Sequence, residues 1–183
     1  MPPTTHTEAD ARAVRLAAAI RTVADFPRPG IAFRDITTLL ADPGAFRETV
    51  DALAGAHAGA GVDLVAGVES RGFILGAPVA HVLGAGFVPI RKQGRLPAAT
   101  ITASYALEYG EAVLEVHADA IARGQRVLIV DDLLATGGTA AAAIDLVERL
   151  GGEVVALAFL IELTDLDGAS ALGGRPHTTL IEL

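Results

Sequence analysis

The stretch VLIVDDLLATGGT, from Val127 to Thr139, carries most of the information about fold and chemistry in this chain. It begins with a short, wholly apolar run, continues with the carboxylates Asp131 and Asp132, and ends in a loop of small residues before a helical pattern. Such apolar runs are typical of strands buried on both faces of a parallel sheet. These sheets bind ligands where a strand ends and a loop leads into the next helix. We therefore expect the ligand site at this loop.

The loop itself has the composition of a phosphate-binding segment: it consists of Ala135, Thr136, Gly137, Gly138 and Thr139. Glycine allows tight turning and close approach of the backbone to a ligand. A helix start offers unpaired N–H groups and a positive dipole potential, and threonine hydroxyls add donors. The two preceding aspartates would repel a phosphate, but they suit ribose hydroxyls or a magnesium ion reached through water. Phosphate next to sugar hydroxyls describes a ribose 5-phosphate.

Other phosphate motifs do not match this chain. A P-loop requires Gly-Lys-Ser/Thr, but the loop contains no lysine, and the dinucleotide pattern GxGxxG is absent. The serine of ESRG does not form the hydrolase motif GxSxG, because Val68 stands where glycine is required. An ordinary strand, turn and capped helix remains the alternative interpretation, and the paired aspartates before Thr-Gly-Gly-Thr disfavour it.

Periodicity predicts an α/β protein with a mostly parallel twisted sheet flanked by helices. We expect one domain over residues 11–183, preceded by a flexible N-terminus at residues 1–10. A polar loop is expected at residues 91–105. The expected helices are 11–24, 45–58, 72–83 and 139–150, and the expected strands are 62–68, 86–90, 107–117 (or a hairpin), 126–130 and 153–161.

Composition narrows the function classes. The 183 residues carry a formal charge of −8 and no cysteine, which excludes disulfides, thiolate chemistry and cysteine-ligated metals. No signal peptide or membrane-length apolar run is visible, so we expect a cytoplasmic protein without a membrane partner. Residues 70–107 contain no acidic side chain but four basic ones, Arg71, Arg91, Lys92 and Arg95. This acid-free segment indicates a site for a small anion and disfavours a nucleic-acid partner.

The sequence also resembles a known family. VLIVDDLLATGGT resembles the motif that binds 5-phosphoribosyl 1-diphosphate (PRPP) in type I phosphoribosyltransferases. Further segments, in the family's order, resemble adenine phosphoribosyltransferases in particular, and with them the match covers most of the chain after about Thr22. They are DFPRPGIAFRDIT (25–37), ESRGF (69–73), IRKQGRLP (90–97), SYALEYG (104–110) and IELTDLDGASAL (161–172).

This resemblance implies the type I phosphoribosyltransferase fold, with a small N-terminal hood (residues 11–45) and a flexible lid loop (residues 96–109). It implies transfer of phosphoribosyl from PRPP to adenine, giving AMP and pyrophosphate, with Mg²⁺ carried by PRPP near Asp131 and Asp132. No residue is identified as a direct metal ligand. A homodimer is also implied, in which a partner subunit contributes side chains to the site.

The resemblance implies roles for individual residues as well. Glu108 is the expected general acid–base for the N7 proton of adenine, and Arg71 and Lys92 are the expected catalytic cations. Ala32, Phe33 and Arg34 match the adenine pocket, where Phe33 can stack on the purine.

Four further residues are expected to bind substrate: Ser70, Arg91, Arg95 and Tyr109. The family often has a cis peptide at the position of Glu69–Ser70. It usually has lysine at the position of Arg95, and arginine keeps the charge but changes the geometry. Two alternative functions remain, a phosphoribosyltransferase for another base and a PRPP-sensing regulator. The LEYG and FRDI segments oppose the first, and the acidic charge opposes the second.

Overall fold

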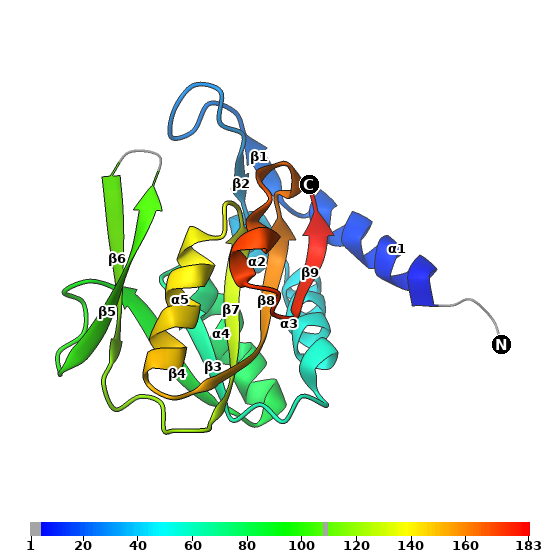
Figure 1. Ribbon diagram of the computed structural model, residues 1–183. Helices are drawn as coiled ribbons and strands as arrows, with labels where there is room; N and C mark the ends of the chain where they lie inside the picture. The colour runs from blue at the N-terminus through cyan, green and yellow to red at the C-terminus, as the bar shows by residue number, and fades with distance from the viewer. Residues whose placement is uncertain (1–4, 108–109) are drawn as a thin grey trace.

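A computed structural model describes residues 5–107 and 110–183 of the chain (Figure 1). The helices are α1 (Thr5–Ala18), α2 (Thr37–Ala41), α3 (Pro43–His57), α4 (Arg71–Leu83), α5 (Gly138–Arg149) and the 3-10 helices η1 (Thr164–Leu166) and η2 (Gly168–Leu172). The strands are β1 (Arg21–Val23), β2 (Phe33–Asp35), β3 (Leu64–Val68), β4 (Gly86–Lys92), β5 (Thr100–Leu107), β6 (Gly110–His117), β7 (Arg126–Leu134), β8 (Glu153–Glu162) and β9 (His177–Glu182).

A seven-stranded sheet with the order β5-β6-β4-β3-β7-β8-β9 forms the centre of the molecule. The five strands from β4 to β9 in this order are parallel, whereas β6 pairs antiparallel with β4 and β5 pairs antiparallel with β6. The prediction of a mostly parallel sheet flanked by helices is confirmed. Because the parallel strands share one direction, their carboxyl ends meet at one edge, the upper edge in Figure 1.

Both faces of the sheet are buried, which explains the continuous apolar run of β7. Val127 and Ile129 belong to a cluster that contains the buried residues of α5, including Leu146. Leu128 and Val130 belong to the cluster on the other face, which contains buried residues of α1, α3 and α4. Alternation along a strand sends successive side chains to opposite faces, so a strand covered on both sides is apolar at every position.

A two-stranded antiparallel sheet of β1 and β2 forms part of the N-terminal region. Arg21 on β1 forms an ion pair with Asp35 on β2. Hydrogen bonds from Thr37 and Arg21 lower the pKa of Asp35 to about 2. The chain between these strands lies above the upper edge of the large sheet in Figure 1. The segment expected to form a hood therefore overhangs the edge where ligands bind in folds of this class.

Capping residues account for the start of α3 and the end of α4, two helices that pack on the same face of the sheet. The Asp42 side chain accepts hydrogen bonds from the N–H groups of Gly44 and Ala45, at 2.8 and 3.0 Å, and Pro43 occupies the first turn of α3. This combination is favoured at helix N-termini. Gly84, with φ at 68°, ends α4 in the left-handed conformation that glycine adopts without strain.

Several boundaries differ from the sequence-based expectations. The polar loop expected at residues 91–105 is wrong in its second half, because β5 begins at Thr100 and pairs with β6 along its whole length. Ile101 and Tyr105 pack against the core from β5, so alternation within a polar stretch was the missed signal. The first helix ends at Ala18 instead of residue 24, and the strands β1, β2 and β9 were not expected.

Within the described ranges, no helix is both long enough and apolar enough to cross a membrane.

Candidate active site

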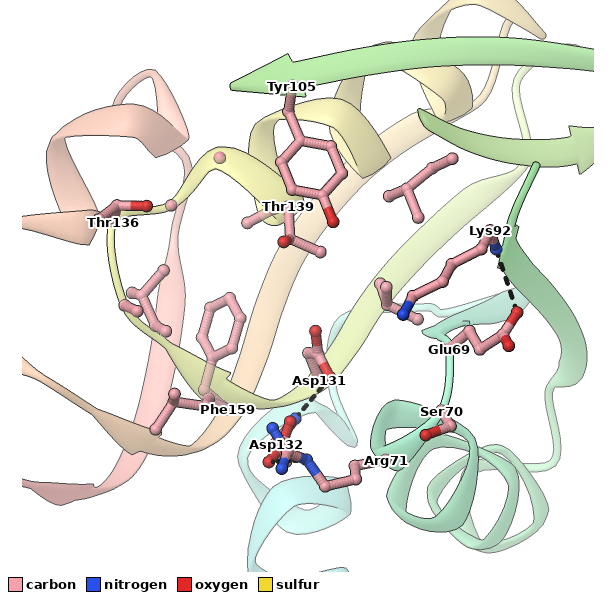
Figure 2. Close-up of a pocket in the computed structure, with 18 residues that line it drawn as sticks. Glu69, Ser70, Arg71, Lys92, Tyr105, Asp131, Asp132, Thr136, Thr139 and Phe159 are labelled. Carbon is pink, nitrogen blue, oxygen red and sulfur yellow. Dashed lines mark hydrogen bonds and ion pairs between the residues drawn. The ribbon is translucent and has the colours of Figure 1, made fainter. Parts of the chain in front are cut away.

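A cavity of about 380 Å³ opens at the carboxyl edge of the sheet, at the loop that the sequence singled out (Figure 2). Its lining comes from five places: the end of β3 with the start of α4, the end of β4, the hairpin β5–β6, the segment from the end of β7 into α5, and β8. The lining residues are Val68, Glu69, Ser70, Arg71, Lys92, Tyr105, Leu114, Asp131, Asp132, Leu133, Leu134, Ala135, Thr136, Gly137, Gly138, Thr139, Ala140 and Phe159.

The loop of residues 135–139, hereafter the phosphate loop, forms one wall of the cavity. Gly137 is the N-cap of α5 with φ at 79°, a left-handed conformation in which other residues are strained. As a glycine it has no side chain to cap the helix, so the first N–H groups of α5 remain available to a ligand. Thr136 and Thr139 add hydroxyls on the same wall (Figure 2). The wall therefore has the donors that a phosphate requires.

Asp131 and Asp132 lie within β7, which continues to Leu134, beyond the strand end expected at Val130. The Asp132 N–H donates to Asp131 Oδ1 at 2.8 Å. Burial raises the pKa of Asp131 well above its ordinary value, and the charge of Asp132 raises it further. Burial also raises the pKa of Asp132, although the Arg71 guanidinium opposes this shift. Paired carboxylates at this depth need ligand hydroxyls or a cation beside them.

Arg71 at the start of α4 already has an anionic partner inside the protein. Its Nε lies 2.7 Å from Asp132 Oδ2, and this carboxylate is only 6% exposed. The guanidinium also lies over the ring of Phe33, 5.3 Å from the ring centre. Arg71 thus connects the two-stranded N-terminal sheet to the carboxylates of β7. Its positive charge opposes the helix dipole at the start of α4, and Asp132 balances that charge.

Lys92 reaches from the end of β4 toward the centre of the cavity (Figure 2). Its backbone N–H donates to Glu69 Oε2 at 3.0 Å, and the Arg91 Nε donates to the same oxygen at 3.1 Å. Burial would raise the pKa of Glu69, but these two donors outweigh it and lower the pKa. The peptide between Glu69 and Ser70 is cis, as the resemblance implied. Glu69 therefore joins the β3–α4 connection to β4 beside the cavity.

Among the residues predicted for the site, Ser70, Arg71, Lys92, both aspartates and the phosphate loop line this cavity. Ala32, Phe33, Arg34, Arg91 and Arg95 do not. The Arg34 Nη1 donates to Thr22 Oγ1 at 2.6 Å, within the two-stranded sheet. The Arg91 Nη1 donates to the carbonyl oxygen of Arg95 at 3.1 Å.

Glu108 and Tyr109 lie outside the described residues, and the roles expected for them stay predictions.

Apolar and aromatic residues of the cavity were not predicted. Tyr105 extends into it from β5, opposite the β7 carboxylates (Figure 2), and Phe159 on β8 belongs to its lining. Leu114, Leu133 and Leu134 also belong to this apolar part. They belong to alternating or apolar strands, and nothing in the sequence distinguishes them from ordinary core positions.

Glu115 is a further unpredicted residue, and it follows the cavity residue Leu114 on β6. It is 4% exposed, and its Oε1 accepts hydrogen bonds from the N–H groups of Arg95 and Leu96 at 2.7 and 2.8 Å. Burial would raise the pKa of Glu115, but these backbone donors lower it overall. The carboxylate therefore holds the turn that follows Lys92.

The described lining of the cavity contains few side chains that could hold a metal ion. Among the described residues, no group of three or more His, Cys, Asp or Glu side chains could hold a metal. Asp131 and Asp132 are two adjacent carboxylates in the cavity. Mg²⁺ usually keeps several waters and binds through one or two carboxylates plus substrate phosphates. The residues present therefore fit an ion delivered with a phosphorylated substrate.

Comparison with known proteins agrees with this geometry. The family described as "Phosphoribosyl transferase domain" matches residues 36–171. The adenine phosphoribosyltransferase of Methylobacterium nodulans is 58% identical over 166 residues, covering 90% of this chain and 92% of that protein. The crystal structure of adenine phosphoribosyltransferase from Thermoanaerobacter pseudethanolicus has a TM-score of 0.91 and 52% identity, covering 93% of this chain and 99% of the other. The Saccharomyces cerevisiae enzyme, crystallised with an imino-altritol bisphosphate and adenine, has a TM-score of 0.88 and 41% identity, with coverages of 93% and 99%.

Proposed function

Because this chain belongs to the phosphoribosyltransferase family, we propose that its cavity performs the reaction of its adenine phosphoribosyltransferase relatives. It transfers the 5-phosphoribosyl group from PRPP to N9 of adenine and releases AMP and pyrophosphate. The observation that carries this conclusion is that the phosphate loop and the paired carboxylates Asp131 and Asp132 line one cavity.

Within this cavity the phosphate loop binds the 5-phosphate of PRPP. The N–H groups at the start of α5 and the hydroxyls of Thr136 and Thr139 supply its donors. Asp131 and Asp132 accept hydrogen bonds from the ribose hydroxyls, since these acceptors lie just before the phosphate loop in the chain. In this proposal the anomeric carbon of the ribose lies beside the carboxylates and within reach of the cations Arg71 and Lys92.

Arg71, Lys92 and Ser70 receive the pyrophosphate. As the anomeric carbon loses pyrophosphate, negative charge grows on the leaving group, so cations aimed there stabilise the transition state more than the ground state. Arg71 exchanges Asp132 for the pyrophosphate when PRPP binds, which leaves Asp132 to the ribose. The ion pair with Asp132 therefore holds both side chains near their working positions before PRPP arrives. Arg91 and Arg95 are the further cations of this region, and a partner subunit supplies some of these contacts.

The base site lies between the N-terminal hood and the lid. Phe33 is the aromatic surface for the purine, and Arg71 over its ring keeps it at the edge of the cavity. Ala32 and Arg34 contribute backbone groups that recognise adenine. Glu108 handles the N7 proton while N9 attacks the anomeric carbon, and Tyr109 contacts substrate. These assignments rest on the resemblance of residues 25–37 and 104–110 to the family.

Mg²⁺ is the proposed cofactor, with Asp131 and Asp132 holding it through water together with PRPP. When bound, this ion neutralises charge on the pyrophosphate.

The working unit is proposed to be a homodimer in the cytoplasm. α4 leaves Ile74 and Val82 exposed to 44% and 52%, a large apolar exposure for the outer side of a helix. PRPP and AMP are highly charged and do not enter lipid, so the reaction belongs in the compartment that contains them.

A panel of bases tests the proposed reaction. Purified protein is incubated with PRPP, Mg²⁺ and one base at a time: adenine, hypoxanthine, guanine, xanthine, orotate or uracil. We expect AMP and pyrophosphate with adenine alone. Turnover of another base would overturn the adenine assignment. PRPP binding without any turnover, accompanied by salt-sensitive binding to nucleic acid, would support a PRPP-sensing regulator instead.

A further inference from the structure

The segment IELTDLDGASAL (161–172) matches the family's pattern, but the reaction described above gives it no role. In the structure it contains the end of β8, η1 and η2. Figure 1 shows this part of the chain, in red-orange, beside α5. η2 does not line the cavity, and yet it packs directly behind the phosphate loop, as the contacts of Gly137 and Gly168 demonstrate.

The backbones of η2 and the phosphate loop touch at two glycines. A Cβ atom on Gly137 would lie 2.5 Å from the carbonyl oxygen of Gly168 and 2.6 Å from the Ala171 Cβ. A Cβ atom on Gly168 would overlap the carbonyl oxygen of Ala135 and lie 3.0 Å from Leu134 Cγ. Because a Cβ atom would clash at either position, both residues must be glycine for η2 and the phosphate loop to pack this closely. No side chain separates η2 from the loop, so a displacement of either backbone displaces the other.

η2 is in turn attached to both elements that flank the phosphate loop. Ahead of it, the Leu163 N–H donates to the carbonyl oxygen of Leu134, the last residue of β7, at 2.9 Å. At its end, Leu172 is fully buried in the core. The Arg175 Nη1 donates to the carbonyl oxygen of Leu172 at 3.0 Å, and its Nη2 lies 2.5 Å from Glu148 Oε1 on α5.

We propose that η2 is the rigid support of the phosphate loop and that Gly168 is a positioning residue for PRPP binding, acting through its contacts with Ala135 and Gly137. This inference rests on the proposed function of the loop. A glycine-rich loop loses much conformational entropy when a ligand orders it. A support that holds its backbone before PRPP arrives removes that cost, and its N–H groups are already aimed at the phosphate.

The substitution Gly168→Ala tests the proposal by pushing on the Ala135 carbonyl. We expect the KM for PRPP to rise by about tenfold or more, as misplaced binding groups do, while the KM for adenine and kcat at saturating PRPP change little. Gly152→Ala is the matched control. A Cβ there is also crowded, lying 2.9 Å from Ile121 Cγ2 and from Val147 Cγ1, but Gly152 does not line the cavity. It should lower Tm and leave the KM for PRPP unchanged.

Calorimetric titration with ribose 5-phosphate separates this inference from the reaction itself. Gly168→Ala should weaken its binding, and Gly152→Ala should not. If the wild-type protein binds ribose 5-phosphate but makes no AMP, the proposed function fails while the role of Gly168 is still measured. Unchanged ribose 5-phosphate affinity and unchanged PRPP KM in a folded Gly168→Ala variant would overturn the positioning role.

Hydrogen exchange of the wild-type protein gives a second test that needs no variant. Ribose 5-phosphate should slow amide exchange in residues 168–172 together with residues 135–139, because the two backbones are in contact. Slower exchange confined to the phosphate loop would also contradict the proposal, even if Gly168→Ala failed to fold.

Discussion

At the scale of single residues, the carboxylates in and beside the cavity are of two kinds. Glu115 accepts hydrogen bonds from two backbone N–H groups, and its pKa is lowered overall although burial opposes the shift. Asp131 lies against another carboxylate, and burial together with that charge raises its pKa. The first arrangement stabilises a turn in the unliganded protein. The second keeps acceptors ready for a ligand at a cost in stability.

Asp131→Asn should therefore stabilise the protein and weaken PRPP binding. An acid whose pKa is raised by folding holds its proton more tightly in the folded state. The stability that this more tightly held proton gives the folded state is lost as pH rises from the unfolded pKa of about 3.9 through the raised folded pKa. The wild-type protein should lose stability over this interval and the variant should not, so the stability difference between them should grow as pH rises.

Urea unfolding between pH 4 and pH 8 measures this difference, and PRPP titration measures the loss of affinity. Asp145→Asn serves as the control, because Asp145 is 51% exposed and is paired with Arg149 on the surface of α5. A stability difference between wild type and Asp131→Asn that stays constant across this pH range would contradict the assignment of the raised pKa to Asp131.

At the scale of elements, the binding wall depends on how β7 passes into α5. β7 carries the carboxylates within the sheet, Gly137 turns the chain in the left-handed region, and α5 starts with its N–H groups facing the cavity. The hairpin β5–β6 closes the cavity from the other side through Tyr105. Most of β5 was expected to belong to a polar loop, whereas a strand or hairpin was expected where β6 lies.

Thr139→Val tests the contribution of the α5 N-terminus. Valine keeps the shape of threonine but lacks the hydroxyl, so we expect PRPP and ribose 5-phosphate to bind about tenfold more weakly, as for one lost hydrogen bond to a charged group. The measurement is calorimetric titration. Thr178→Val on β9, which does not line the cavity, should bind both ligands like the wild type. Equal affinities in all three proteins would remove the Thr139 hydroxyl from the phosphate site.

At the scale of the whole molecule, the acid-free segment (residues 70–107) distributes its cations around one edge of the sheet. Arg71 and Lys92 line the cavity, and Arg91 and Arg95 lie in and after β4, near Glu69 and Glu115. The remaining surface carries the excess of acidic residues. Two of these cations are already ion-paired at this edge, Arg71 with Asp132 and Arg91 with Glu69.

Sedimentation tests the proposed dimer. We expect twice the mass of the chain at micromolar concentration, and Val82→Glu should shift the protein to the mass of one chain, since it places a charge on the apolar side of α4. Val14→Glu is the control, because Val14 is 71% exposed on α1 and its substitution should leave the dimer intact. A single-chain mass for the wild-type protein at this concentration would overturn the dimer.

The sequence alone determined those features that depend on neighbouring residues along the chain. The apolar run predicts a strand buried on both faces. The two aspartates predict hydrogen-bond acceptors, and the glycine loop before a helix predicts phosphate donors. Each of these predictions follows from local backbone preference and side-chain chemistry. The mostly parallel sheet follows from the repetition of such units.

Only the tertiary structure decided which distant residues meet. The pairing of Arg71 with Asp132, the position of Arg71 over Phe33, and the contact of Gly168 with Ala135 join segments far apart in the chain. In the sequence, Glu115 is one acidic residue in an alternating strand. The register of β6 against β4 is what brings it to the turn after Lys92. Such contacts depend on strand register and on close packing between elements, neither of which local sequence patterns specify.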